Sequence, residues 1–209
     1  MTENEVVEKV TKKCDVGSEA VLAPPTNFAM VECGIYRSAF PQPANFEFLR
    51  ALELRSIIYL CMEPYPDENM GFVKANNIKL FQFGIEGKTE VSVSIPKDTI
   101  LNALKVVIDV RNHPVLIHCN GGKHRTGCLV ACFHKALNWC LDSVLEEYQK
   151  YAGIKSRATD MKFIENFDVN TLRQSLYRII YQYHGYGSHK RRLLYNDDST
   201  IRKPKITSI

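Results

Sequence analysis

The sequence predicts an α/β fold with a central, mostly parallel sheet flanked by helices. Short apolar runs alternate along the chain with longer segments in which apolar residues recur at helical spacing. Alternation of this kind favours a parallel sheet covered by helices. The 209 residues, 45% hydrophobic and 24% charged, suit one domain with a sizeable core. No internal repeat is visible.

These patterns place the elements in order along the chain. Strands are expected over 28–31, 35–37, 56–60, 79–83 and 115–118, and helices over 45–52, 67–75, 97–110, 141–151 and 159–167, with another opening at Cys128. Pro96 occupies a position where the first turn of a helix tolerates proline, and apolar residues from Leu101 to Ile108 keep helical spacing. We therefore expect the 97–110 helix to pack behind the loop that follows the last strand.

The two ends differ in character from the centre. Residues 1–24 are polar and reach Pro24-Pro25, which indicates a flexible leader. Over 185–209, six Lys or Arg residues stand against two Asp residues, which predicts a solvated basic tail. Basic tails also bind nucleic acid or anionic lipid, but no aromatic stacking pattern accompanies this one, so no nucleic-acid partner is expected. The domain between the two ends spans 25–184.

Several classes of protein are disfavoured by composition. No apolar stretch approaches the roughly 20 residues of a membrane span, and residues 1–10 are too charged for a secretory signal. Seven cysteines, an odd number without a framework spacing, fit a reducing compartment, so we expect the cytoplasm or the nucleus. The formal charge of +4 is mild and indicates an anionic ligand only where it is concentrated.

One ten-residue segment carries most of the chemical information. It reads His-Cys-Asn-Gly-Gly-Lys-His-Arg-Thr-Gly over 118–127, between the last predicted strand and the helix that opens at Cys128. The N–H groups and partial positive charge at a helix N-terminus bind phosphate and stabilise a nearby thiolate. Glycines at 121, 122 and 127 let the backbone curl so that successive N–H groups point at one anion. The segment predicts a phosphate-binding loop around Cys119.

Three side chains of this segment suit phosphoryl transfer. Cys119 is the candidate nucleophile. Arg125 offers a planar guanidinium that binds two oxygens of a phosphoryl group and stabilises the charge on them during transfer. Thr126 is placed to donate its hydroxyl to the sulfur when the thiolate leaves a cysteinyl-phosphate intermediate. The candidate substrate-binding residues between them are Asn120, Gly121, Gly122, Lys123 and His124.

Two other interpretations compete with a nucleophile. A cysteine beside a strand is often a core residue, but a core residue has no need of a glycine pair, a lysine, two histidines and an arginine close by. A zinc site is the second. Its candidate ligands are clustered, but no pair has the Cys-x-x-Cys spacing of a structural site; they are His118, Cys119, His124, Cys128 and Cys132. We therefore expect neither a metal nor a cofactor.

The spacing Cys119-x5-Arg125-Thr126 resembles the signature of the cysteine-dependent protein tyrosine and dual-specificity phosphatase superfamily. From Phe28 to about Phe167 the chain is similar to the plant and fungal atypical dual-specificity phosphatases. The matching stretches are Gly34-Ile35-Tyr36-Arg37-Ser38, Arg55-Ser56-Ile57-Ile58-Tyr59-Leu60, Glu63-Pro64-Tyr65-Pro66, Phe83-Gly84-Ile85-Glu86-Gly87 and Gly122-Lys123-His124-Arg125-Thr126-Gly127-Cys128-Leu129. The resemblance implies a cysteine-phosphatase fold for 25–184. It also implies removal of the β-phosphate from diphosphoinositol polyphosphates, the inositol pyrophosphates, with some activity on phosphoproteins and phosphoinositides.

A proton donor for the leaving oxygen is harder to place. The superfamily usually carries an aspartate on a mobile loop roughly thirty residues before the cysteine. That window holds no aspartate here and offers Glu86 and Glu90, in a glycine-bearing loop after a predicted strand. Either is a candidate acid, although loop glutamates are usually only solvated. We expect His118 to orient the loop as a structural partner rather than to donate a proton.

Both the missing aspartate and the local charge favour a diphosphate substrate. A tyrosine phenol has a pKa of about 10, whereas the second pKa of a phosphate is about 6, so a phosphate departs without much protonation. Several cations near one site also suit a densely phosphorylated ligand. Beside Lys123, His124 and Arg125, the candidates are Lys88 in the acid-bearing loop and Lys155 and Arg157, which resemble the Lys-x-Arg that lies close to inositol phosphate in the family.

Two departures from the family pattern bear on substrate binding. Gly121 stands where relatives typically carry arginine, and residues 88–91 read Lys-Thr-Glu-Val where they tend to have Asn-Lys-Glu-Pro. One paired charge is worth about 1 to 3 kcal/mol in such sites, so the missing arginine affects the binding of a polyphosphate.

The motif, the resemblance and the local charge together predict an inositol pyrophosphate phosphatase whose partner is an anionic phosphorylated small molecule. The alternatives are a dual-specificity phosphatase acting on phosphoproteins or phosphoinositides, and a phosphate-binding pseudophosphatase.

Overall fold

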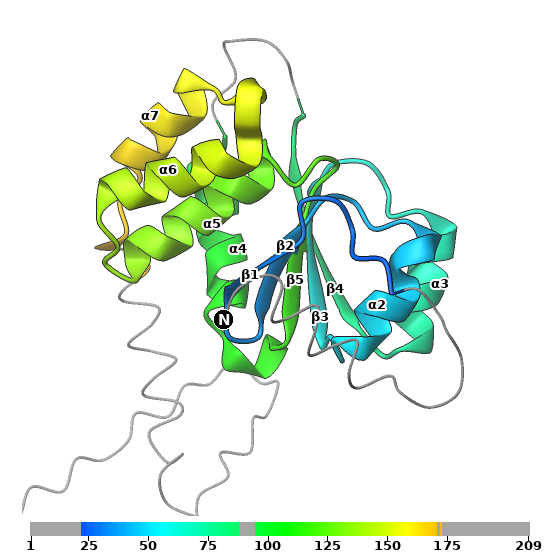
Figure 1. Cartoon of the computed structure of the whole chain (residues 1–209). Helices are drawn as coiled ribbons and strands as arrows, with labels where there is room; N and C mark the ends of the chain where they lie inside the picture. Colours follow the sequence, from blue (N-terminus) through cyan, green and yellow to red (C-terminus); the bar gives the residue numbers. More distant parts are fainter. Residues whose placement is uncertain (1–21, 88–94, 171, 173–209) are drawn as a thin grey trace, which may run out of the picture.

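A five-stranded sheet in the order β1-β2-β5-β3-β4 forms the centre of the computed structural model, which describes residues 22–87, 95–170 and 172 (Figure 1). The strands are β1 Ala29–Glu32, β2 Ile35–Ser38, β3 Ser56–Cys61, β4 Lys79–Ile85 and β5 Val115–His118. β1 pairs antiparallel with β2, while β2, β5, β3 and β4 pair in parallel. The prediction of an α/β fold with a mostly parallel sheet is confirmed.

The two central strands are buried along their whole length. All six residues of β3 and all four of β5 are buried, as expected for parallel strands with both faces covered. His118 at the end of β5 lies opposite Ser38 of β2 and Tyr59 of β3. The segments that follow these strands therefore begin at the same edge of the sheet, which is where parallel α/β proteins place their sites.

Helices cover both faces of the sheet (Figure 1). On one side lie α2 Phe46–Ala51 and α3 Asp67–Ala75, and on the other lie α4 Lys97–Val107, α5 His124–Ala136, α6 Leu141–Ala152 and α7 Ala158–Asn166. Short 3-10 turns occupy Pro43–Asn45, Val110–Asn112 and Gly153–Lys155. Every residue of α5 from Arg125 to His134 is buried, because α6 and α7 cover the face of α5 that points away from the sheet. Their shared apolar cluster includes Cys128, Ala131, Val144 and Tyr148.

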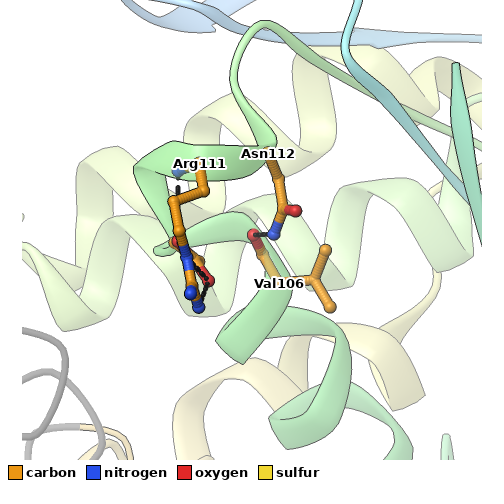
Figure 2. Close-up of polar contacts among 4 residues, drawn as sticks. Val106, Arg111 and Asn112 are labelled. Atoms are coloured by element: carbon orange, nitrogen blue, oxygen red, sulfur yellow. Dashed lines mark hydrogen bonds and ion pairs between the residues drawn. The ribbon is translucent and has the colours of Figure 1, made fainter. Parts of the chain in front are cut away.

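The helix predicted over 97–110 ends earlier, at Val107. The Asp109 carboxylate accepts hydrogen bonds from the backbone and the guanidinium of Arg111, and the Asn112 side chain donates to the Val106 carbonyl oxygen at 2.9 Å (Figure 2). These bonds replace helical ones and start the 3-10 turn that leads into β5. α4 packs against α5, the helix that follows the Cys119 loop, and against β4.

The ends of the chain lie largely outside the described residues. Of the predicted leader, 22–24 are described, and the predicted basic tail over 185–209 is outside. Leu172, near the end of the described part, is buried in the main core. In the described ranges, no helix is both long enough and apolar enough to cross a membrane.

Candidate active site

The site is built where four parallel strands end. Cys119 follows β5 directly and is 3% exposed. The ends of β2, β3 and β4 contribute the neighbouring backbone. The loop from Cys119 to Lys123 then enters α5 at His124, four residues earlier than the sequence predicted. Arg125, Thr126 and Gly127 therefore belong to the first turn of the helix rather than to the loop.

Three consecutive carbonyl groups of this loop are hydrogen-bonded from outside it. The donors are Phe40 N at 3.0 Å, Asn27 Nδ2 at 2.8 Å and Arg37 Nη2 at 2.9 Å, which reach the carbonyl oxygens of Asn120, Gly121 and Gly122 respectively. In a trans peptide the C=O and the following N–H point in opposite directions. These bonds therefore turn the N–H groups of residues 121–123 to the other side of the loop, and consecutive N–H groups so arranged form an anion-binding nest.

The glycines of the segment have three different roles. Gly122 has φ +63°, and a Cβ there would lie 2.6 Å from the backbone of Ser38 and Ala39, so only glycine fits. Gly127 is helical, donates its N–H to the Lys123 carbonyl oxygen, and approaches the Tyr148 ring so closely that a Cβ would lie 2.9 Å from it. Gly127 thus serves helix packing and not, as the sequence suggested, the curl of the loop. Gly121 has room for a side chain, because a Cβ there would lie 3.7 Å from Cγ of Lys123, an ordinary van der Waals contact.

Arg125 is held against the end of β4 and the residues that follow it. Its Nη1 donates a hydrogen bond to the Ile85 carbonyl oxygen at 3.0 Å, and the residue is 9% exposed. A Cβ on Gly87 would lie 3.3 Å from Nη2, so the loop backbone passes close to the guanidinium. One of its five N–H donors is used on Ile85, which fixes the plane of a group suited to binding phosphate oxygens in pairs.

Thr126 is fully buried in the first turn of α5, and its hydroxyl has no hydrogen-bond partner among the described residues. The hydrogen bond from Thr126 to the Cys119 sulfur is predicted for the step in which the thiolate leaves a cysteinyl-phosphate, and it is absent from this structure. Burying a hydroxyl without a hydrogen-bond partner costs about 1 to 3 kcal/mol of stability. A state of the site that places an acceptor beside Thr126 removes this cost.

His118 lies inside the protein beneath the loop. Its Nε2 is 3.1 Å from the Tyr65 hydroxyl, and the rings of Phe40, Tyr59 and Tyr65 surround it. Burial lowers the pKa of His118 to about 3. The imidazole is therefore neutral at physiological pH, and this geometry supports a structural role over that of a proton donor.

His124 belongs to a polar network that the sequence did not reveal. Its Nδ1 lies 3.0 Å from Asp160 Oδ2 and 3.2 Å from the Tyr148 hydroxyl, and that hydroxyl donates to Asp160 at 2.6 Å. The Arg157 backbone N–H also reaches the Tyr148 oxygen, at 3.3 Å. Because Tyr148 gives its hydrogen to Asp160, its oxygen accepts from both nitrogens, so Nδ1 of His124 carries a hydrogen. The network ties the segment of Lys155 and Arg157 to the phosphate loop.

The remaining predicted residues divide by location. Asn120 accepts a hydrogen bond from the Cys61 thiol at 3.4 Å, and burial raises the pKa of Cys61, which keeps it protonated. Glu86 is exposed between Ile85 and Gly87, next to the contacts of Arg125. Lys123 is half-buried and Lys155 is exposed. Lys88 and Glu90 lie outside the described residues. Within the described ranges, no group of three His, Cys, Asp or Glu side chains could hold a metal ion.

Comparison with known proteins agrees with this geometry. A family model described as "Tyrosine phosphatase family" matches residues 22–184. The chain belongs to this family. It is therefore a phosphatase, as the sequence predicted.

Several relatives of this phosphatase are named inositol diphosphatases. It is 65% identical over 185 residues to inositol diphosphatase DSP3 of Arabidopsis thaliana, covering 88% of this chain and 91% of the relative. It is 47% identical to inositol diphosphatase SIW14 of Saccharomyces cerevisiae, covering 72% of this chain and 54% of the relative. The crystal structure of the catalytic core of the SIW14 phosphatase superposes with a TM-score of 0.72 at 44% identity, covering 75% of this chain and 94% of that one. The cysteine-phosphatase fold is thereby confirmed.

Proposed function

We propose that this phosphatase removes the β-phosphate of diphosphoinositol polyphosphates through a cysteinyl-phosphate intermediate on Cys119. The observation that carries the chemistry is the loop around Cys119, whose N–H groups at 121–123 are turned to one side by three outward hydrogen bonds. The substrate class is supported by 65% identity to a relative named as an inositol diphosphatase.

In the first step the Cys119 thiolate attacks the β-phosphorus. A sulfur–phosphorus bond forms while the bond from phosphorus to the bridging oxygen breaks, and the electron pair leaves with that oxygen on the α-phosphate. The loop N–H groups and Arg125 hold the oxygens of the transferred group, where negative charge accumulates. Preorganised donors are effective because the protein need not reorganise during the reaction.

In the second step a water oxygen attacks the same phosphorus and the sulfur–phosphorus bond breaks. Inorganic phosphate departs, the proton of the water passes to solvent, and the thiolate is regenerated. The buried Thr126 hydroxyl, which has no partner among the described residues, suits the role of donor to the sulfur as its charge returns. We assign Thr126 to this step.

Leaving-group chemistry supports a diphosphate over an aryl or alkyl ester. The α-phosphate leaves with its bridging oxygen, and because the second pKa of a phosphate is about 6 it needs little protonation at neutral pH. Glu86, the candidate acid in the described part of the chain, stands next to the residue that accepts from Arg125. We propose that it, or Glu90, assists esters more than diphosphates.

Basic and hydrogen-bond-donating groups around the loop suit a ligand with many phosphates. Lys123, His124 and the Lys155–Arg157 segment border the loop, and the Asp160 network fixes the His124 ring and the Arg157 backbone. We propose that these groups bind phosphates of the inositol ring that do not react. Gly121, with space for a side chain, is the position at which an arginine would add another cation.

A comparison of substrates tests this function. The purified protein is assayed with diphosphoinositol polyphosphate, a phosphotyrosine peptide and phosphoinositide vesicles, with Cys119→Ser in parallel. We expect the value of kcat/KM to be highest for the diphosphate and to be abolished by the substitution. Peptide or vesicle turnover more than about tenfold above diphosphate turnover, a difference of about 1.4 kcal/mol in activation free energy, would reject the substrate. Binding without turnover would identify a pseudophosphatase.

A further inference from the structure

Arg37 is a buried arginine at the carboxyl end of β2, only 1% exposed, and it heads the largest fully buried side chains of the described residues. Burying a guanidinium costs free energy that its neighbours must offset. We propose that Arg37 is a positioning residue for phosphoryl transfer, which holds the Gly122 carbonyl so that the adjoining N–H points at the phosphate. The inference rests on the proposed function in taking Cys119 as the nucleophile of that loop.

The contacts of Arg37 converge on the loop from one side and on α6 from the other. Nη2 donates to the Gly122 carbonyl oxygen at 2.9 Å. The guanidinium carbon lies 3.8 Å from the centre of the Tyr151 ring, and Nη1 lies 3.5 Å from Glu147 Oε1. Burial lowers the pKa of Arg37, and the charges of Glu147 and Cys119 oppose that shift. The arginine is thus within electrostatic reach of the nucleophile.

The bond to Gly122 controls an N–H group of the nest. The Gly122 carbonyl and the Lys123 N–H belong to one planar peptide and point in opposite directions. Gly122 lies against the backbone of Ser38 and Ala39, so closely that a Cβ would lie 2.6 Å from their atoms. Beside this close backbone contact, the hydrogen bond from Arg37 sets the direction in which the peptide between Gly122 and Lys123 points.

Removing one partner of a buried ion pair is usually destabilising, because the other charge loses its partner. Glu147, the partner of Arg37, is 20% exposed and keeps its contact with His134, which lessens this loss. An apolar side chain of similar size cannot, however, donate to the Gly122 carbonyl. A positioning role therefore predicts a loss of kcat in Arg37→Met that a loss of stability alone does not explain.

The Arg37 contacts also reach an optical probe. Glu147 Oε2 lies 2.6 Å from His134 Nδ1, and the His134 ring stacks on Trp139 with 4.0 Å between centroids and 3° between planes. Trp139 is the single tryptophan of the chain. Its fluorescence therefore reports whether the surroundings of Glu147 survive a substitution at Arg37.

The experiment compares Arg37→Met and Arg37→Lys with Arg50→Met, a change at an exposed arginine of α2 that pairs with Glu47. Readouts are kcat and KM for an aryl phosphate, inhibition by orthovanadate, and thermal unfolding followed by Trp139. We expect Arg37→Met to lower kcat by about 10²-fold, the usual effect of losing one oxyanion donor. Orthovanadate inhibition should weaken in parallel, and KM should change little. Arg50→Met should match the wild type.

The proposal would be overturned if Arg37→Met unfolds cooperatively and keeps kcat and orthovanadate inhibition within about threefold of the wild-type values. A threefold change in kcat corresponds to less than about 0.7 kcal/mol in activation free energy. If Arg37→Met does not fold, Arg37→Lys decides: we expect a kcat loss of at least about tenfold with an unchanged melting temperature. A lower melting temperature with unchanged kcat would overturn the proposal. These assays use no inositol compound, so they test Arg37 independently of the substrate class. If the wild type hydrolyses the aryl phosphate here but does not hydrolyse the diphosphate in the comparison of substrates, only the proposed substrate is rejected.

Discussion

Arg125 Nη1 donates a hydrogen bond to the Ile85 carbonyl oxygen at 3.0 Å. The bond joins the first turn of α5 to the last residue of β4, so the proposed phosphate clamp is oriented by backbone from a different strand. The next residues along the chain are Glu86, the candidate acid, and Gly87, whose Cα faces the guanidinium. Clamp and candidate acid are thus parts of one assembly, preorganised as electrostatic stabilisation of a transition state requires.

Gly87→Ala tests this assembly. The added Cβ would lie 3.3 to 3.4 Å from three atoms of the Arg125 guanidinium, so the clamp must shift by a few tenths of an ångström. We expect kcat to fall by about 3- to 10-fold with little change in stability, because small misplacements of reacting groups are costly. The control is Gly84→Ala, whose Cβ would meet the exposed Met62 side chain at 3.3 Å. Equal activities of the two variants would contradict the account.

Gly122→Ala tests the tightest point of the loop. Its φ of +63° and the 2.6 Å approach to the Ser38 and Ala39 backbone leave no room for a methyl group. Left-handed strain and overpacking together should lower the free energy of unfolding by about 2 to 4 kcal/mol, with kcat down by at least about 10²-fold. Gly71→Ala in α3, which meets nothing within 4 Å, should be neutral or slightly stabilising. Denaturant unfolding and steady-state kinetics measure both effects, and an active, fully stable Gly122→Ala would refute the loop geometry.

Asp160→Asn tests the network around His124. An amide in place of the carboxylate keeps the shape but removes the charge that the His124 Nδ1–H and the Tyr148 hydroxyl both reach. We expect KM for the diphosphate to rise by about 3- to 10-fold, with a smaller change for an aryl phosphate, since one charged hydrogen bond is worth about 1.5 to 3 kcal/mol. Asp142→Asn, at an exposed position in the first turn of α6, serves as control. A change of the same size for both substrates would mean that the network does not serve recognition.

Acid stability tests the burial of His118. Its pKa falls from the ordinary 6.5 to about 3 in the folded protein, so below pH 6.5 the unfolded chain binds a proton that the native state does not. Above about pH 6.5 this difference in proton binding does not lower the free energy of unfolding. As pH falls from there toward 3, the free energy of unfolding decreases by a total of about 4 to 5 kcal/mol. Urea unfolding at several pH values should therefore show a flatter acid slope for His118→Gln. Identical slopes for the two proteins would contradict the burial.

The sheet and most helices could be predicted because their apolar patterns are local. Helix α3 was predicted with its observed bounds, Asp67–Ala75. The start of α5 was not, because Arg125-Thr126-Gly127 looks like loop until the helix is seen to open at His124. α4 ended early because the Asp109 side chain competes with helical hydrogen bonds, a local event with no periodic signal.

In the site, the residues of one contiguous motif could be predicted, and those that act across the fold could not. Cys119, Arg125 and Thr126 stand in a single segment with recognisable spacing. Arg37 lies in β2, far along the chain from its partner Gly122, and looks like an ordinary polar residue of a strand. Asp160 likewise meets His124 only once α7 packs against α5. Such pairings arise from topology, which a single sequence does not display.

The most direct test of the central claim is the value of kcat/KM for diphosphoinositol polyphosphate, measured by phosphate release for the wild type and for Cys119→Ser. Serine keeps the loop but lacks the thiolate that attacks phosphorus. The account predicts a loss of at least about 10³-fold with substrate binding retained. A Cys119→Ser variant that keeps more than about a tenth of wild-type turnover, within 1.4 kcal/mol, would contradict it.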